Sequence, residues 1–153
     1  MNEFERLCAI EEIRQLKARY FRGVDTGDAA LMRSLLAEDC LLDYRSCFTD
    51  PATGRNFLPS LGAVLRGSAS WTGKGLSNAG IVSVHQGHTG EIALTGDTSA
   101  HAIWSMTDRL FMPAGSEFSV VTGYGYYHET YEKIRGDWKI KTLHMTRIRV
   151  EGS

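Results

Sequence analysis

The chain has 153 residues, which suits one domain with one hydrophobic core, and we expect a single domain over residues 1–153. Its 17 basic and 18 acidic residues give a net charge of -1, and no run of Lys/Arg exceeds two, so nucleic acid is not an expected partner. The N-terminus lacks an apolar signal core and no stretch reaches the roughly 18 apolar residues of a membrane span, so we expect a cytoplasmic protein without a membrane partner.

The first part of the chain predicts two helices. Seven apolar residues recur at steps of three and four, which is the period of a helix with one apolar face. They are Phe4, Leu7, Ile10, Ile13, Leu16, Tyr20 and Val24. This first helix is expected over about residues 3–25 and ends at Gly27. Asp28 can cap a second helix that continues to about residue 39.

The middle of the chain predicts short elements and loops. A strand is expected over 40–44, followed by a turn at 50–55 that begins with Asp-Pro and contains Gly. A weak third helix is expected over 58–65. The segment 67–80 is rich in Gly and Ser and is predicted to be a loop. The three cysteines show no Cys-x-x-Cys spacing, which favours free thiols over a zinc site.

The second half of the chain predicts a sheet. Long runs rich in Val, Ile, Tyr, Trp and Thr are separated by short turn signals. The expected strands are 81–94, 99–111, 118–133 and 138–150. Because connections this short join antiparallel neighbours, we expect a meander, and glycines inside the long strands let it bend. The predicted fold is α+β: a curved antiparallel sheet wraps around the N-terminal helices as a cone with an internal pocket.

The pair of histidines in His85-Gln-Gly-His88 is the strongest chemical signal, together with Asp25 at the end of the first helix. An imidazole oriented by a carboxylate is the minimal unit for moving protons near neutral pH. A carboxylate there faces the unfavourable end of the helix dipole, so stability does not explain it. The competing interpretation makes Asp25 a turn residue that satisfies backbone donors before the second helix.

The chain resembles the nuclear-transport-factor-2-like superfamily, in the polyketide-cyclase-like (SnoaL-like) branch that includes scytalone dehydratase, bile-acid dehydratase and hexachlorocyclohexane dehydrochlorinase. Segments along nearly the whole chain carry the resemblance. They are Ile10–Tyr20, Val24–Asp28, His85–Ile92, Gly96–Thr98, Trp104–Asp108, Gly123–Lys133, Gly136–Trp138 and Thr146–Arg147. The resemblance implies the fold more firmly than the chemistry, since the superfamily also contains isomerases, hydrolases and proteins without catalysis.

The resemblance implies four catalytic residues. Asp25 matches the family's catalytic aspartate, and His85 stands at the spacing before Gly96-Asp97 where relatives place the paired histidine. Tyr20 matches a tyrosine that bile-acid dehydratases have five residues before the aspartate, and Tyr44 matches a scytalone dehydratase tyrosine loosely. A protonated phenol can donate to a carbonyl oxygen that gains negative charge, although both tyrosines could equally be core residues.

His88 competes with His85 for the role of base. Residues three apart on a regular strand face opposite sides, so both enter the pocket only if a bulge forms at Gly87 or Gly90. The same spacing argues against a shared metal, and neither metal nor cofactor is expected. His128 and Arg147 are further candidates, for substrate binding. Arg147 could bind an anionic group, although a position on the surface face explains it better.

The chemistry predicted from these groups is loss of water beside a carbonyl, with a hydroxylated aromatic or polycyclic, steroid-like ketone as the small hydrophobic substrate. One alternative is a ketosteroid-isomerase or cyclase type of enzyme that uses Asp25 as the base. Another is a non-catalytic module like the β-subunits of aromatic-ring dioxygenases. A homodimer or homotrimer is expected, because relatives bury the outer face of such a sheet, with Val120, Tyr124 and Tyr126 or their odd-numbered neighbours at the interface.

Overall fold

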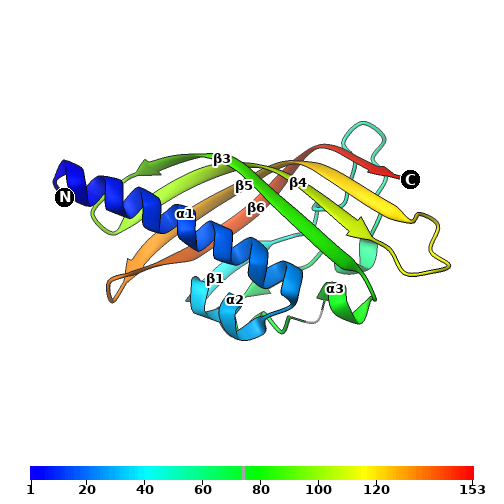
Figure 1. Ribbon diagram of the computed structural model, residues 1–153, viewed down its shortest axis with the longest axis horizontal. Coiled ribbons are helices and arrows are strands. Elements are labelled where there is room, and N and C mark those ends of the chain that lie inside the picture. The colour runs from blue at the N-terminus through cyan, green and yellow to red at the C-terminus, as the bar shows by residue number, and fades with distance from the viewer. Residues whose placement is uncertain (74) are drawn as a thin grey trace.

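The computed structural model describes residues 1–73 and 75–153. Helices come first and long strands follow (Figure 1). In chain order the elements are α1 (Glu3–Thr26), α2 (Ala29–Leu35), β1 (Leu36–Asp43), a 3-10 turn (Pro59–Leu61), β2 (Val64–Arg66), a second 3-10 turn (Ser68–Ser70), α3 (Gly75–Asn78), β3 (Val82–Leu94), β4 (Ser99–Phe111), β5 (Val120–Ile134) and β6 (Asp137–Gly152).

The boundaries of α1 follow from its capping residues. The Asn2 side chain accepts from the backbone N–H of Glu5, whose carboxylate accepts from the backbone N–H of Asn2, so both ends of a capping box are satisfied. Gly27 ends the helix in the left-handed conformation, with φ 64°. Asp28 then caps α2 by accepting from the N–H of Leu31. The predicted first helix and the roles of Gly27 and Asp28 are confirmed.

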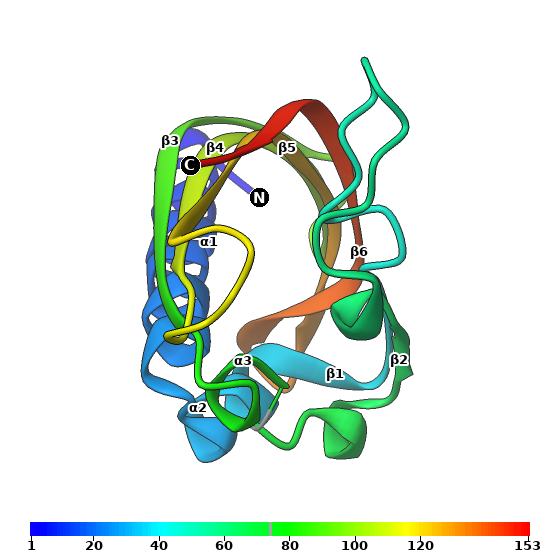
Figure 2. The same ribbon diagram turned by 90° about the vertical axis from the view of Figure 1, so that its right-hand side faces the viewer.

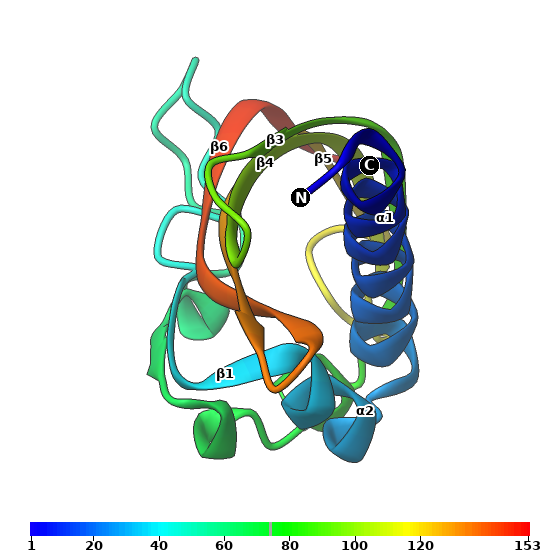
Figure 3. The same ribbon diagram turned by 90° about the vertical axis from the view of Figure 1, so that its left-hand side faces the viewer.

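The strands form one curved sheet in the order β2-β1-β6-β5-β4-β3. The last four strands are an antiparallel meander, as predicted. The sequence did not predict that β1 pairs with β6 in parallel and thereby extends the sheet. The sheet curves around an interior and remains unclosed, and α1 lies along one side of it, packed mainly against β3 (Figures 2 and 3).

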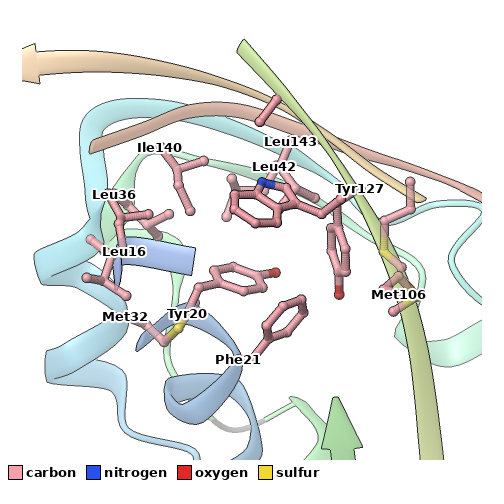
Figure 4. Packing of buried hydrophobic residues seen from close by; sticks show 14 of the residues in the cluster. Leu16, Tyr20, Phe21, Met32, Leu36, Leu42, Met106, Tyr127, Ile140 and Leu143 are labelled. Atoms are coloured by element: carbon pink, nitrogen blue, oxygen red, sulfur yellow. The ribbon is translucent and has the colours of Figure 1, made fainter. Parts of the chain in front are cut away.

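The core lies between α1 and the inner face of the sheet. Burial alternates strictly along β4, where the inward residues are Ala100, Ala102, Trp104, Met106, Asp108 and Leu110. On α1 the buried face carries Leu16, Tyr20 and Phe21. The rings of Tyr20 and Phe21 gather with that of Tyr127 of β5, whereas Leu16 lies near Leu36 (Figure 4). This aromatic group forms one wall of the region where α1 ends.

Two predicted helices in this part of the chain are wrong or shortened. The second helix ends at Leu35, not near residue 39, because Leu36, Cys40 and Leu42 bury their side chains as part of β1. The segment 58–65 forms only a 3-10 turn before β2, which pairs with β1. Pairing of the backbone in the sheet outweighs the local helical pattern at both places. The predicted loop 67–80 contains the second 3-10 turn and α3, and its residue 74 lies outside the described residues.

The apolar stripe of α1 is buried only over its second half. Ile13, Leu16 and Tyr20 are buried, whereas Phe4 and Leu7 are 74% and 61% exposed. The predicted apolar face is therefore only partly buried in the first turns of the helix, where Cys8 is half-buried. Among the described helices, α1 included, none is both long and apolar enough to cross a membrane.

Candidate active site

The end of α1 meets β3 at Asp25 and His85. Oδ1 of Asp25 lies 2.6 Å from Nδ1 of His85, and Oδ2 accepts from the backbone N–H of the same histidine at 2.9 Å. The hydroxyl of Ser83, also on β3, donates to Oδ1 at 2.9 Å. Asp25 does not cap the next helix, which is the role of Asp28. The predicted contact between carboxylate and imidazole is present.

Two local patterns build this contact. Phe21 and Asp25 are four residues apart on α1 and therefore share a face. On β3, Ser83, His85 and Gly87 point inward because side chains alternate along a strand. The rings of Phe21 and His85 stack, with centroids 6.0 Å apart and an interplanar angle of 18°. A Cβ at Gly87 would collide with the Phe21 ring. The glycine therefore provides the space that this ring occupies when it stacks on the imidazole.

The contact fixes which nitrogen of His85 is available for chemistry. An ionised carboxylate only accepts hydrogen bonds, so Nδ1 must carry the proton that faces Asp25. In the neutral imidazole, Nε2 then carries the lone pair. The nearby carboxylate of Asp108 has its Oδ2 3.8 Å from Nε2, too far for a hydrogen bond but close enough to stabilise an imidazolium. The His85 side chain is 7% exposed, so this charge would form largely out of water.

Asp108 is held in turn by Arg147. The guanidinium donates Nη1–H to Oδ1 at 3.0 Å and Nη2–H to Oδ2 at 2.8 Å, which is a two-pronged ion pair. Both side chains are buried, at 2% exposed for Arg147 and 3% for Asp108. The prediction of a surface position for Arg147 is therefore wrong, because the side chain enters the interior from β6.

Two tyrosine hydroxyls face the same region. Oη of Tyr20 and Oη of Tyr44 lie 2.6 Å apart. Burial raises the pKa of Tyr20 well above its ordinary value, and burial likewise raises the pKa of Tyr44. Both groups therefore stay protonated near neutral pH. Because only one of the two hydrogens is needed between them, the other can be donated to a ligand.

These groups open onto one cavity of about 270 Å³. Its polar side is formed by His85, Asp108 and Arg147, with the hydroxyls of Tyr20, Tyr44 and Tyr127. The remaining walls are mainly apolar, with Val24, Phe48, Leu61, Leu65, Trp71, Leu76 and Met145 among them. Asp25 does not line the cavity, because it lies behind His85. A mostly apolar pocket with a few convergent polar groups is the usual form of a small-molecule site.

Comparison with known proteins identifies the family of the chain. The sequence model of the SnoaL-like domain matches residues 5–144. The chain belongs to the SnoaL-like domain family. This family is part of the nuclear-transport-factor-2-like superfamily, so the predicted resemblance and α+β fold class are confirmed.

Solved structures with the SnoaL-like fold show the same architecture at low sequence identity. A hexachlorocyclohexane dehydrochlorinase (LinA) of type 2 superposes with a TM-score of 0.76 at 15% identity, over 99% of this chain and 93% of that one. The type 3 enzyme of Novosphingobium barchaimii LL02 gives 0.75 at 16%, over 99% and 94%. A "Putative Scytalone Dehydratase" of Novosphingobium aromaticivorans DSM 12444 gives 0.76 at 18%, over 99% and 92%. At these identities the likeness establishes the fold alone.

Two predicted site residues of this SnoaL-like chain lie outside the cavity. The register of β3 against β4 shifts between Gly87 and Gly90, so the bulge is present. His88 directly follows the inward-facing Gly87 and therefore faces outward. Its imidazole is exposed, 3.2 Å from the hydroxyl of Thr107. His128 occupies an outward position on β5, where it stacks on His144 with ring centroids 4.6 Å apart. The predictions that place these two histidines at the site are wrong.

A buried ion pair lies behind the tyrosines. The ammonium of Lys17 is 2.5 Å from Oε1 of Glu129, and Tyr131 donates a hydrogen bond to the same carboxylate. The ammonium also lies over the rings of Tyr127, Tyr20 and Phe21, 3.6, 4.2 and 4.5 Å from their centroids. Burial lowers the pKa of Lys17 to about 8, opposed by the attraction of Glu129. The pair anchors the aromatic wall on which His85 stacks.

Asp108, Lys17 and Glu129 were not predicted as functional residues. A usable signal existed for two of them, because Asp108 and Glu129 occupy inward positions of strands whose other inward residues are mostly apolar. A charge at such a position requires a partner. For Lys17 the signal is its place beside Leu16 on the buried face of the helix.

Proposed function

We propose that the protein is a lyase that removes water from a hydroxylated ring ketone by acid–base chemistry, without a metal or organic cofactor. The observation that carries the proposal is the 2.6 Å contact between Asp25 and Nδ1 of His85, which in the neutral imidazole places the Nε2 lone pair beside the cavity. The fold shared with a dehydrochlorinase and with a "Putative Scytalone Dehydratase" supports elimination as the type of reaction.

The reaction divides into two proton transfers through one imidazole. Nε2 of His85 takes the proton from the carbon next to the carbonyl, and the electron pair of that C–H bond moves to form an enolate. The imidazolium that results is stabilised by Asp25 on one side and by Asp108, 3.8 Å away, on the other. The imidazolium then protonates the departing hydroxyl as its C–O bond breaks. Water and an unsaturated ketone are the products.

The enolate oxygen requires a donor, and Tyr44 is proposed for this role. Tyr20 is fully buried, whereas Tyr44 is only partly buried, so in the hydrogen-bonded pair Tyr44 can direct its free hydrogen into the cavity. We expect Tyr44→Phe to lower kcat by a factor on the order of 10²–10³, the usual effect of removing one donor from a developing oxyanion. A steady-state assay checks this, and an unchanged kcat would exclude Tyr44 as the donor.

The volume of the cavity limits the size of the substrate. Its volume of about 270 Å³ is just below the roughly 300–1,000 Å³ of pockets for drug-sized ligands. A ketone with one or two rings therefore fits better than the polycyclic, steroid-like skeleton that the sequence suggested.

The experiment is a screen of one- and two-ring β-hydroxy ketones with purified protein in the presence of EDTA. Formation of the conjugated ketone raises the ultraviolet absorbance and reports dehydration directly. We expect at least one compound to turn over with the wild type and none at that rate with Asp25→Asn. If the whole panel remains unreacted although members of it bind, the non-catalytic module becomes the better account.

The isomerase alternative is less compatible with this site. A carboxylate base must reach the substrate, but Asp25 lies behind His85 and accepts from Ser83 and from the backbone and ring of His85. If His85→Ala kept full activity and Asp25→Asn lost it, the carboxylate mechanism would replace ours.

We also propose that the protein self-associates through the outer face of its sheet. Val82 and Val84 of β3 are 63% and 41% exposed, and Tyr124 and Tyr126 of β5 present partly exposed rings on the same outer face. We expect light scattering at micromolar concentration to return two or three times the 17.0 kDa of the chain. A mass of 17.0 kDa would contradict this.

A further inference from the structure

The cavity contains a buried arginine whose charge is already matched. Among the described residues that line the cavity, Arg147 is the one with a permanent positive charge. A free guanidinium there would attract carboxylates and phosphates strongly. Its environment shows that it does not have this role.

The hydrogen-bonding capacity of Arg147 is almost fully used within the protein. Nη1 and Nη2 donate to the two oxygens of Asp108, and Nε donates to the carbonyl oxygen of Cys47 at 2.6 Å. Nη1 also contacts Sδ of Met106 at 3.2 Å. All but one of the five N–H groups of the guanidinium therefore have a partner. The remaining N–H can donate to a neutral oxygen, but it cannot grip an anion bidentately.

The strand register makes room for this ion pair. Asp108 of β4 lies directly opposite Gly123 of β5, and a Cβ at Gly123 would collide with both Asp108 and Arg147. The missing side chain lets the arginine reach across from β6 to the carboxylate. The pairing is a consequence of the sheet geometry and does not depend on a flexible contact.

The charges at the polar side of the cavity leave no excess of positive charge. Asp108 cancels Arg147, and Asp25, whose side chain is 23% exposed, adds a negative charge behind His85. Lys17 does not compensate, because its own partner is Glu129. An anionic ligand would meet carboxylates that repel it at short range in a poorly solvated site.

We infer that Asp108 is a specificity-determining residue: by matching the charge of Arg147 it makes the cavity select neutral ring ketones and reject anionic analogues of the same shape. The inference rests on the proposed function only in taking the cavity as the substrate site. Binding alone tests it, so a protein that binds the ketone but turns over no substrate would refute the proposed reaction and leave this inference standing.

The test compares two probes of nearly identical shape, methyl naphthyl ketone and naphthoate, which differ by a methyl group in place of a charged oxygen. Isothermal titration calorimetry of the wild type at neutral pH is expected to show ketone binding at least about tenfold tighter than naphthoate binding, a difference of about 1.4 kcal/mol. Equal affinity, tighter binding of naphthoate, or no binding of the ketone would each overturn the inference.

Two variants test whether the Asp108–Arg147 pair causes the preference for the ketone over naphthoate. Asp108→Asn keeps the shape but frees the charge of Arg147, so naphthoate should bind at least about tenfold more tightly than to the wild type while ketone affinity changes by less than about threefold. The double variant Asp108→Asn with Arg147→Met removes both charges together. It has no unpaired buried cation, so it can be studied even if the single variant folds poorly. This double variant should keep ketone binding and show no gain for naphthoate. A gain in the double variant, or none in a folded Asp108→Asn, would show that Arg147 is not the charge that Asp108 matches.

Discussion

Replacing His85 with glutamine is expected to lower kcat/KM for dehydration of the hydroxy ketone substrate by a factor on the order of 10²–10⁴. This is the usual contribution of a positioned general base. Asp25→Asn should have an effect of similar size, because the amide can no longer hold Nδ1–H and orient the ring. The double variant should be little worse than the more damaged single variant, since groups that act as a unit are not additive. Steady-state kinetics with the substrate found in the screen measure all three.

The chain offers a matched control in His88. It is a histidine on the same strand, but its imidazole is exposed on the outer face, 3.2 Å from Thr107. His88→Gln is expected to leave kcat/KM within about twofold of the wild type, as is usual for a surface change. If His88→Gln lost activity and His85→Gln retained it, the assignment of the base would be reversed.

The largest effect on stability is expected at the buried ion pair. Lys17→Met leaves the carboxylate of Glu129 buried without its cation, and we expect the free energy of unfolding to fall by about 3–5 kcal/mol. Urea denaturation followed by circular dichroism measures this change. Arg19→Met is the control, because Arg19 is exposed on the same helix and its loss should cost less than about 0.5 kcal/mol.

A second substitution distinguishes loss of the pair from loss of packing. Lys17→Met combined with Glu129→Gln removes both charges and leaves an amide oxygen that Tyr131 can still donate to. More than half of the lost free energy should return, because the cost of a broken buried pair lies mainly in the uncompensated charge. A double variant as unstable as Lys17→Met would indicate that packing of the lysine side chain, and not its charge, stabilises this region.

Local patterns were sufficient for the elements whose burial is regular. The period of three and four located α1, and its caps at Asn2 and Gly27 are local interactions. Turn signals located the four long strands, and short connections fixed their antiparallel order. The parallel pairing of β1 with β6 joins segments roughly 100 residues apart. No local pattern carries that information, and the second helix was overextended for this reason.

The residues of the candidate site also fall into those that the sequence could predict and those that depend on tertiary pairing. Asp25 and His85 could be predicted from their residue types and from the family resemblance, and the hydroxyls of Tyr20 and Tyr44 lie together at the same cavity. Asp108 and Arg147 are partners across two strands, so their pairing depends on the register of the sheet. A bulge at the glycines was expected, and the register shift lies between Gly87 and Gly90. Whether it would turn His88 inward depended on its location to within one residue, and His88 remains outside.

In the proposed reaction His85, oriented by Asp25, removes a proton from the carbon beside the carbonyl of a ring ketone. Exchange of that proton with solvent in D₂O, followed by NMR on a bound ketone that has no hydroxyl to lose, isolates this step from the departure of water. We expect the wild type and His88→Gln to accelerate the exchange, and His85→Gln and Asp25→Asn to leave it at the rate without protein. Exchange by His85→Gln as fast as by the wild type, or none by a wild type that binds the ketone, would contradict it.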